Sequence, residues 1–200
     1  MAEQSIKDIK KDIYLILHKA QEMMELTEEG FMKSKSPSLD RADAIATEIR
    51  TKEDALTGAL AKIASSNAEA RKILAVPGHI EEAANRITRL SIESRSRIKE
   101  GMLFSDKAIV ETSKLFTKAK EILKKAADAS VTGSSAAVGA IETECVALER
   151  MASDFATSHE ERLVAGECSP KSASTYLSML NAFGGMGGQI KNVVKKLSAV

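Results

Sequence analysis

Apolar residues recur at spacings of three and four along almost the whole of this 200-residue chain. Proline occurs only three times and glycine 11 times, so few residues interrupt the helix-forming segments. Apolar residues at every third or fourth position are typical of a helix with one buried face, whereas a half-buried strand shows strict alternation. We find no candidate strand in the sequence, and the spacing therefore predicts an all-α protein.

Six amphipathic segments follow one another, separated by residues that are typical of turns and caps. We expect helices over approximately these residues: 5–33, 39–65, 67–98, 105–129, 136–165 and 169–197. The segment 34–38 is expected to break the first helix, and Pro77 is expected to kink the third. Ser105 and Ser169 are expected N-caps, with Pro170 at the first helical position of the last helix.

The first three helices and the last three correspond to one another. Residues 49–56 and 141–148 agree at four of eight positions, and we place both segments in the second helix of their half. The order of helix lengths and caps is also similar. We therefore predict an internal duplication with two tandem three-helix bundles, residues 1–100 and 101–200, and a boundary near Gly101.

Composition and charge argue against several classes of function. A formal net charge of +1 provides no long-range field to attract nucleic acid. No run of ~20 apolar residues could span a bilayer, and no signal peptide is apparent, so we expect a cytoplasmic protein. Three scattered histidines (18, 79 and 159) and two isolated cysteines (145 and 168) form no catalytic pattern. We expect a protein that is not an enzyme.

One feature of the last helix is unusual: Gly184, Gly185, Gly187 and Gly188 surround a single methionine. Four glycines in a helix cost about 4 kcal/mol relative to alanine. Three interpretations remain open. The run is a local break, a place where a neighbouring helix packs closely, or a contact face for a ligand or for another protein's helix.

Several passages resemble the PhoU-like proteins, which are free-standing regulators of phosphate uptake and cytoplasmic tails of sodium/phosphate cotransporters. Residues 104–108 (FSDKA) are similar to the start of the second repeat in the cotransporter-like branch. Residues 159–170 (HEERLVAGECSP), followed by Tyr176, resemble that branch's junction between its last two helices, and residues 189–193 (QIKNV) follow the pattern after its final metal motif. The resemblance implies an all-α, PhoU-like fold of two tandem three-helix bundles with six long helices.

The resemblance also implies metal sites, which this chain retains only in part. The PhoU-like signature is E-R-I-[GA]-D, whose Glu and Asp coordinate metal clusters. In the first repeat the matching ligand positions are Glu81 and Asn85, whereas in the second repeat the matching segment is the glycine run. An amide is a poorer ligand than a carboxylate, and glycine provides no side chain. We therefore expect no cofactor, or at most a weakly bound divalent or ferric metal at the first site.

The resemblance implies an accessory or regulatory protein of phosphate transport, acting by protein–protein contact at the cytoplasmic face of the membrane. The expected partner is a phosphate transporter or a phosphate-sensing regulatory protein, with no nucleic acid bound and the membrane reached only through that partner. One alternative is a metal-storage or metal-sensing bundle that uses Glu81 with acidic residues of the second helix. Another is a helical scaffold without a link to phosphate, in which the glycine face forms a homodimer seam.

Overall fold

The computed structural model of this protein describes residues 5–199, and within them it contains seven helices and no strand. Their bounds are α1 (Ile6–Lys33), α2 (Ser36–Ile63), α3 (Ala68–Ile73), α4 (Val76–Lys99), α5 (Asp106–Thr132), α6 (Ser135–Val164) and α7 (Pro170–Leu197). Six of these helices are long, and α3 is a single short one. The prediction of an all-α protein with six long helices is confirmed.

Serine residues begin four of the long helices, including α6, where Ser134 is the N-cap. Ser5 caps α1 and forms a reciprocal capping box with Asp8. The Ser105 side chain accepts a hydrogen bond from the Ala108 backbone N–H at the start of α5. Ser169 caps α7, in front of a proline that has no N–H to leave unsatisfied. The predicted caps of α5 and α7 are therefore confirmed.

Proline marks the start of two helices at places where we predicted a break or a kink. Pro37 lies in the first turn of α2, so the chain turns only at Ser34 and Lys35. Pro77 likewise lies in the first turn of α4, and the expected kinked helix is two helices, α3 and α4. Both prolines are tolerated in the first turn because the first N–H groups of a helix have no partner within it, so the missing N–H of proline costs no helical hydrogen bond. The predicted kink at Pro77 was wrong.

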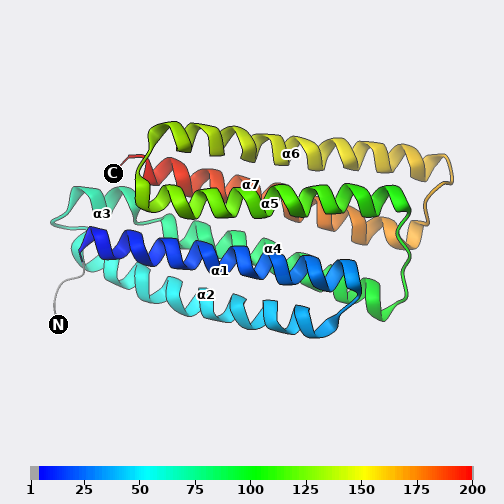
Figure 1. The fold of residues 1–200 in the computed structure, drawn as a ribbon, viewed down its shortest axis with the longest axis horizontal. Helices are drawn as coiled ribbons and strands as arrows, with labels where there is room; N and C mark the ends of the chain where they lie inside the picture. Colours follow the sequence, from blue (N-terminus) through cyan, green and yellow to red (C-terminus); the bar gives the residue numbers. More distant parts are fainter. Residues whose placement is uncertain (1–4, 200) are drawn as a thin grey trace.

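The long helices form two layers, with α1, α2 and α4 in one and α5, α6 and α7 in the other (Figure 1). Helix α1 packs on α5, and α4 packs along α7, so the two layers share one apolar core. Phe31 and Phe183 both contact Phe116, at ring-centroid distances of 5.8 Å and 4.9 Å. The two groups of three helices follow the predicted order, while the division into domains 1–100 and 101–200 stays a prediction.

Within residues 5–199, no helix is long and apolar enough to cross a membrane.

Candidate functional site

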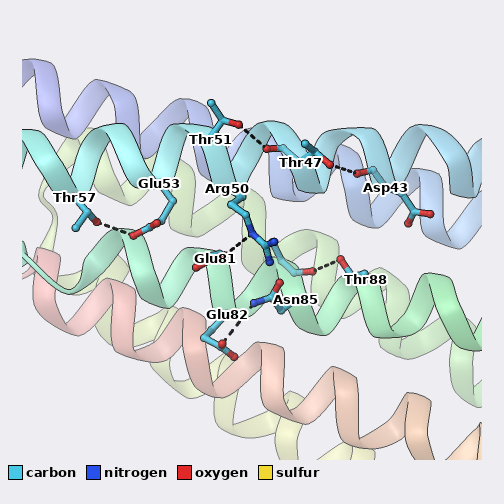
Figure 2. A network of polar contacts seen from close by, with 11 residues as sticks. Asp43, Thr47, Arg50, Thr51, Glu53, Thr57, Glu81, Glu82, Asn85 and Thr88 are labelled. Atoms are coloured by element: carbon cyan, nitrogen blue, oxygen red, sulfur yellow. Dashed lines mark hydrogen bonds and ion pairs between the residues drawn. The ribbon is translucent and has the colours of Figure 1, made fainter.

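Glu81, the carboxylate expected to bind metal in the first repeat, forms an ion pair with an arginine from the neighbouring helix. Arg50 on α2 points across to α4, and its Nε lies 3.0 Å from Glu81 Oε1 (Figure 2). The Glu81 side chain is 27% exposed, so this contact lies partly inside the groove between the helices. A guanidinium cation therefore binds the carboxylate at the position where the PhoU-like pattern implies a metal.

Asn85 lies one turn after Glu81 and does not point to it as a second ligand. Its amide nitrogen is 3.5 Å from the Glu82 carboxylate on the same helix (Figure 2). Asp43 on α2 lines the same recess of about 240 Å³, but its two oxygens already accept hydrogen bonds from Ser91, at 2.9 Å, and Arg95, at 2.7 Å.

These residues do not fit a divalent or ferric metal. Hard and borderline cations bind groups of charged oxygens or imidazoles, whereas this recess offers an amide and two carboxylates, Glu81 and Asp43, that are each already paired with a guanidinium. Among residues 5–199, no three His, Cys, Asp or Glu side chains come together as a metal-binding group. Weak metal binding at Glu81 and Asn85 stays a prediction, and no function is derived from it.

The glycine run lies inside α7, which continues unbroken from Pro170 to Leu197. Three of the glycines face α6. A Cβ atom on Gly187 would lie 3.3 Å from the Cys145 carbonyl oxygen, and one on Gly184 would lie 3.9 Å from Glu149 Cα. A Cβ on Gly188 would be 3.4 Å from a Glu149 carboxylate oxygen. The run is therefore a place of close packing within the chain and is not a local break.

Gly185 faces the opposite neighbour, α4. A Cβ atom here would lie 3.0 Å from Nε of Arg86 and 3.2 Å from its Cζ. A residue larger than glycine at position 185 would therefore crowd the Arg86 guanidinium. Arg86 is partly buried, and it forms no hydrogen bond or ion pair with any residue that the structure describes. Arg86 thus lies beside the glycine run, where the PhoU-like pattern implies a second metal motif, and its side chain has no partner among residues 5–199.

A cavity of about 730 Å³ opens beside Arg86, between α4, α6 and α7. Lys191 and Glu149 also line it, with Lys191 Nζ 3.1 Å from Glu149 Oε1. Asn181 and Asn192 face it from α7, and neither forms a side-chain hydrogen bond within residues 5–199. This cavity combines a cationic group with unpaired amides, and we regard it as the candidate functional site.

A buried polar cluster joins the second layer of helices at one end. Arg162 on α6 donates two hydrogen bonds to Glu111 on α5, at 3.1 Å and 2.8 Å, and the Tyr176 hydroxyl on α7 donates a third at 2.5 Å. All three residues are at most 7% exposed. Burial and the neighbouring carboxylate of Glu111 raise the pKa of Tyr176 well above its ordinary value. The cluster ties three helices together.

Sequence reasoning identified no role for this cluster, although a signal was present. Glu111 lies four residues before Leu115, so it places a carboxylate on the buried face of its helix, and that position requires a partner. Arg162 and Tyr176 both belong to the passage that resembles the PhoU-like junction.

The histidines and cysteines lie apart. His18, His79 and His159 are on α1, α4 and α6, and His79 Nδ1 is 2.8 Å from Gln189 Oε1. Cys145 is a core residue, and burial, followed by the nearby Glu149, raises the pKa of its thiol to about 12. Cys168 lies in the connection between α6 and α7. These groups form no catalytic arrangement in the described part of the chain.

No protein-family model matches this chain, and no curated protein matches its sequence. Solved structures do match. PhoU from Pseudomonas aeruginosa aligns with a TM-score of 0.84 at 12% identity, covering 96% of this chain and 94% of that one. This chain has a PhoU-like fold. The phosphate transport system regulatory protein PhoU from Streptococcus pneumoniae aligns with a TM-score of 0.83 at 9% identity, covering 95% and 91% of the two chains.

A third PhoU-like structure, a phosphate regulatory protein from Shewanella oneidensis MR-1, aligns with a TM-score of 0.64 at 15% identity, over 100% of this chain and 97% of that one. The expected PhoU-like fold is therefore confirmed over nearly the whole chain, at identities that show the fold alone.

Proposed function

We propose that this protein is an accessory regulator of phosphate transport that acts by protein–protein contact at the cytoplasmic face of the membrane. The observation that supports this function most strongly is the PhoU-like fold over 95–96% of the chain, shared with a protein described as a phosphate transport system regulator. Fold alone does not fix function. The residue patterns at 104–108 and 159–170 point in the same direction.

The proposal assigns no catalytic step to this chain. It is supported by the separation of the three histidines on different helices and by the raised pKa of Cys145, which keeps that buried thiol protonated. The buried Glu111 carboxylate accepts hydrogen bonds from Arg162 and Tyr176, and these contacts suit a structural role.

Contact with a partner needs exposed apolar side chains. Among the described large hydrophobic residues, Val164 and Leu103 are the most exposed, at 90% and 86%. Val164 ends α6, and Leu103 lies in the connection between α4 and α5, so both are at the same end of the bundle (Figure 1). The proposed transporter or sensor partner would contact this end.

The test is deletion of the gene in its source organism, followed by measurement of phosphate uptake in phosphate-rich and phosphate-poor medium. We expect uptake that no longer responds normally to phosphate supply, restored by the wild-type gene and less well by a Leu103→Ser/Val164→Ser variant. The proposal would be ruled out if the deletion strain took up phosphate at the same rate as the parent strain and adjusted that rate to phosphate supply in the same way.

The recess around Glu81 does not favour the metal-binding alternative, because Arg50 binds Glu81 and Arg95 binds Asp43, the acidic residue of α2 that lines the recess. The dimer-seam alternative places Gly187 at an interface between copies, whereas in the structure α6 of the same chain covers it.

A further inference from the structure

We propose that the cavity between α4, α6 and α7 binds a small organic anion whose phosphate or carboxylate group is held by Arg86. The cavity's own residues carry this inference, independently of the function proposed above.

The size and the walls of the cavity suit an organic molecule. Its volume of about 730 Å³ lies within the range of roughly 300–1,000 Å³ found for small-molecule sites. Leu177, Leu180 and Ala156 form an apolar part of the lining, and Asn181 and Asn192 add amide groups. A carbon skeleton with a few hydrogen-bonding groups would find partners for both kinds of surface.

Arg86 provides the anchor for the anion. A guanidinium has five N–H donors in one plane, and none of those on Arg86 has a partner among residues 5–199. No Arg86 nitrogen is among the buried unpaired atoms of residues 5–199, so the guanidinium is accessible from the cavity and can bind a phosphate or carboxylate in bidentate fashion. Gly185 keeps this position open, because even a methyl group there would crowd Nε at 3.0 Å.

The charges of the cavity favour an anion and indicate how much charge it carries. Lys191 and Glu149 bind each other at 3.1 Å and largely cancel. Arg86 is then the uncompensated charge of the lining. One anionic group balances it, and the rest of the ligand should be neutral. A fully buried inorganic ion would use only a small part of the volume and none of the apolar wall.

Gln189 provides one further polar contact. Its side-chain oxygen is 2.8 Å from His79 Nδ1, and this bond fixes the orientation of the amide. The amide nitrogen has no protein partner among the described residues, and Gln189 lines the cavity. It would donate to an oxygen of the ligand near Arg86.

The experiment is isothermal titration calorimetry of the full chain with adenosine 5′-monophosphate, benzoate, adenosine and inorganic phosphate as probes. We expect binding of adenosine 5′-monophosphate or benzoate, with at least tenfold weaker binding by Arg86→Gln and no binding of adenosine. Arg150→Gln is the matched control, because Arg150 on α6 lies outside the cavity lining and its side chain is 84% exposed. It should bind like the wild type.

A second variant tests the cavity without changing its charge. Gly188 lines the cavity and has only one neighbouring atom within 4 Å of a Cβ position, the Glu149 carboxylate oxygen at 3.4 Å. Gly188→Leu should fill the space and abolish binding while the helix content remains intact, because leucine is a better helix former than glycine.

Three outcomes would overturn the inference. The first is no heat of binding with either organic anion at concentrations up to about 10 mM, which corresponds to a binding free energy weaker than roughly 3 kcal/mol. The second is equal binding by the wild type and Arg86→Gln. The third is binding of inorganic phosphate as tight as that of adenosine 5′-monophosphate, which would give the apolar wall no part in recognition.

Discussion

Replacing Gly184 by alanine should stabilise this protein, even though the residue lies in the tightly packed part of α7. A glycine inside a helix costs about 1 kcal/mol relative to alanine, because it loses more backbone freedom on folding. The added Cβ atom would lie 3.9 Å from Glu149 Cα and 4.0 Å from Ala152 Cβ, which are ordinary van der Waals distances. We therefore expect Gly184→Ala to raise the free energy of unfolding by about 1 kcal/mol.

Gly187→Ala, one turn further along the same helix, is the matched comparison. It gains the same backbone term, but its Cβ would lie 3.3 Å from the Cys145 carbonyl oxygen and 3.4 Å from Leu148 Cδ2. The carbonyl belongs to the backbone of α6, so the helix itself must shift by a few tenths of an ångström. Overpacking of this kind costs about 1–3 kcal/mol, and we expect no net gain or a loss.

Urea denaturation monitored by far-UV circular dichroism measures both variants. The m-value of the urea transition should stay constant if the folded and unfolded states keep their compactness. On heating, a difference of 1 kcal/mol in a domain of this size corresponds to a change in Tm of about 2–4 °C. The reasoning would be refuted if Gly187→Ala stabilised the protein as much as Gly184→Ala, because α6 would then not pack closely against α7.

Three further predictions concern the polar groups. Glu111→Gln should lower the free energy of unfolding by about 3–5 kcal/mol, because it leaves the buried Arg162 charge unpaired. Chemical denaturation measures this change, and a loss below about 1 kcal/mol would contradict a role of the buried ion pair in stability. Burial and, secondarily, Arg162 lower the pKa of His159 below its ordinary 6.5. Below about pH 6.5 the unfolded chain therefore binds a proton at this residue more readily than the folded chain does, and the free energy of unfolding should fall as the pH drops. His159→Phe should remove that part of the pH dependence below about pH 6.5, and an unchanged slope would assign it to other groups. Elemental analysis of protein purified without chelator or metal-binding tag should find less than one equivalent of metal per chain, because Arg50 pairs with Glu81. One equivalent of metal in the wild type that is lost in Glu81→Ala would show instead that the ion pair opens to admit a metal ion.

The helices could be predicted from the sequence because their signals are local. The apolar spacing and the serine caps at Ser105 and Ser169 depend on residues within one or two turns. The break at residues 34–38 was predicted correctly, whereas Pro77 was misread because a proline that kinks a helix and a proline that begins one leave similar local patterns. Which of the two applies depends on how the flanking segments pack.

The candidate site could be predicted only in part. The positions of Glu81 and of the glycine run were visible in the sequence, but their partners are distant along the chain. Arg50 precedes Glu81 by 31 residues, and Arg86 on α4 reaches Gly185 from the other layer of helices. Such contacts depend on the register of packed helices, which no local pattern specifies.

The eight-residue match between the two halves also has a limit. Residues 49–56 lie in the middle of α2, whereas residues 141–148 lie near the start of α6. Both segments are on the second long helix of their half, as predicted, but they are not at the same depth within it. Identical residues on two amphipathic helices reflect the shared need for apolar residues on one face, in addition to any common origin of the two halves.

The arginine at the first site has a consequence for how this chain could be regulated. A bound metal ion can be withdrawn by a chelator, exchanged for another metal or left out when supply is low, and each of these changes the protein. The guanidinium of Arg50 is attached to the backbone and keeps its charge across the physiological pH range. The ion pair between α2 and α4 at Glu81 is therefore made by the polypeptide's own side chains and needs no metal ion to form.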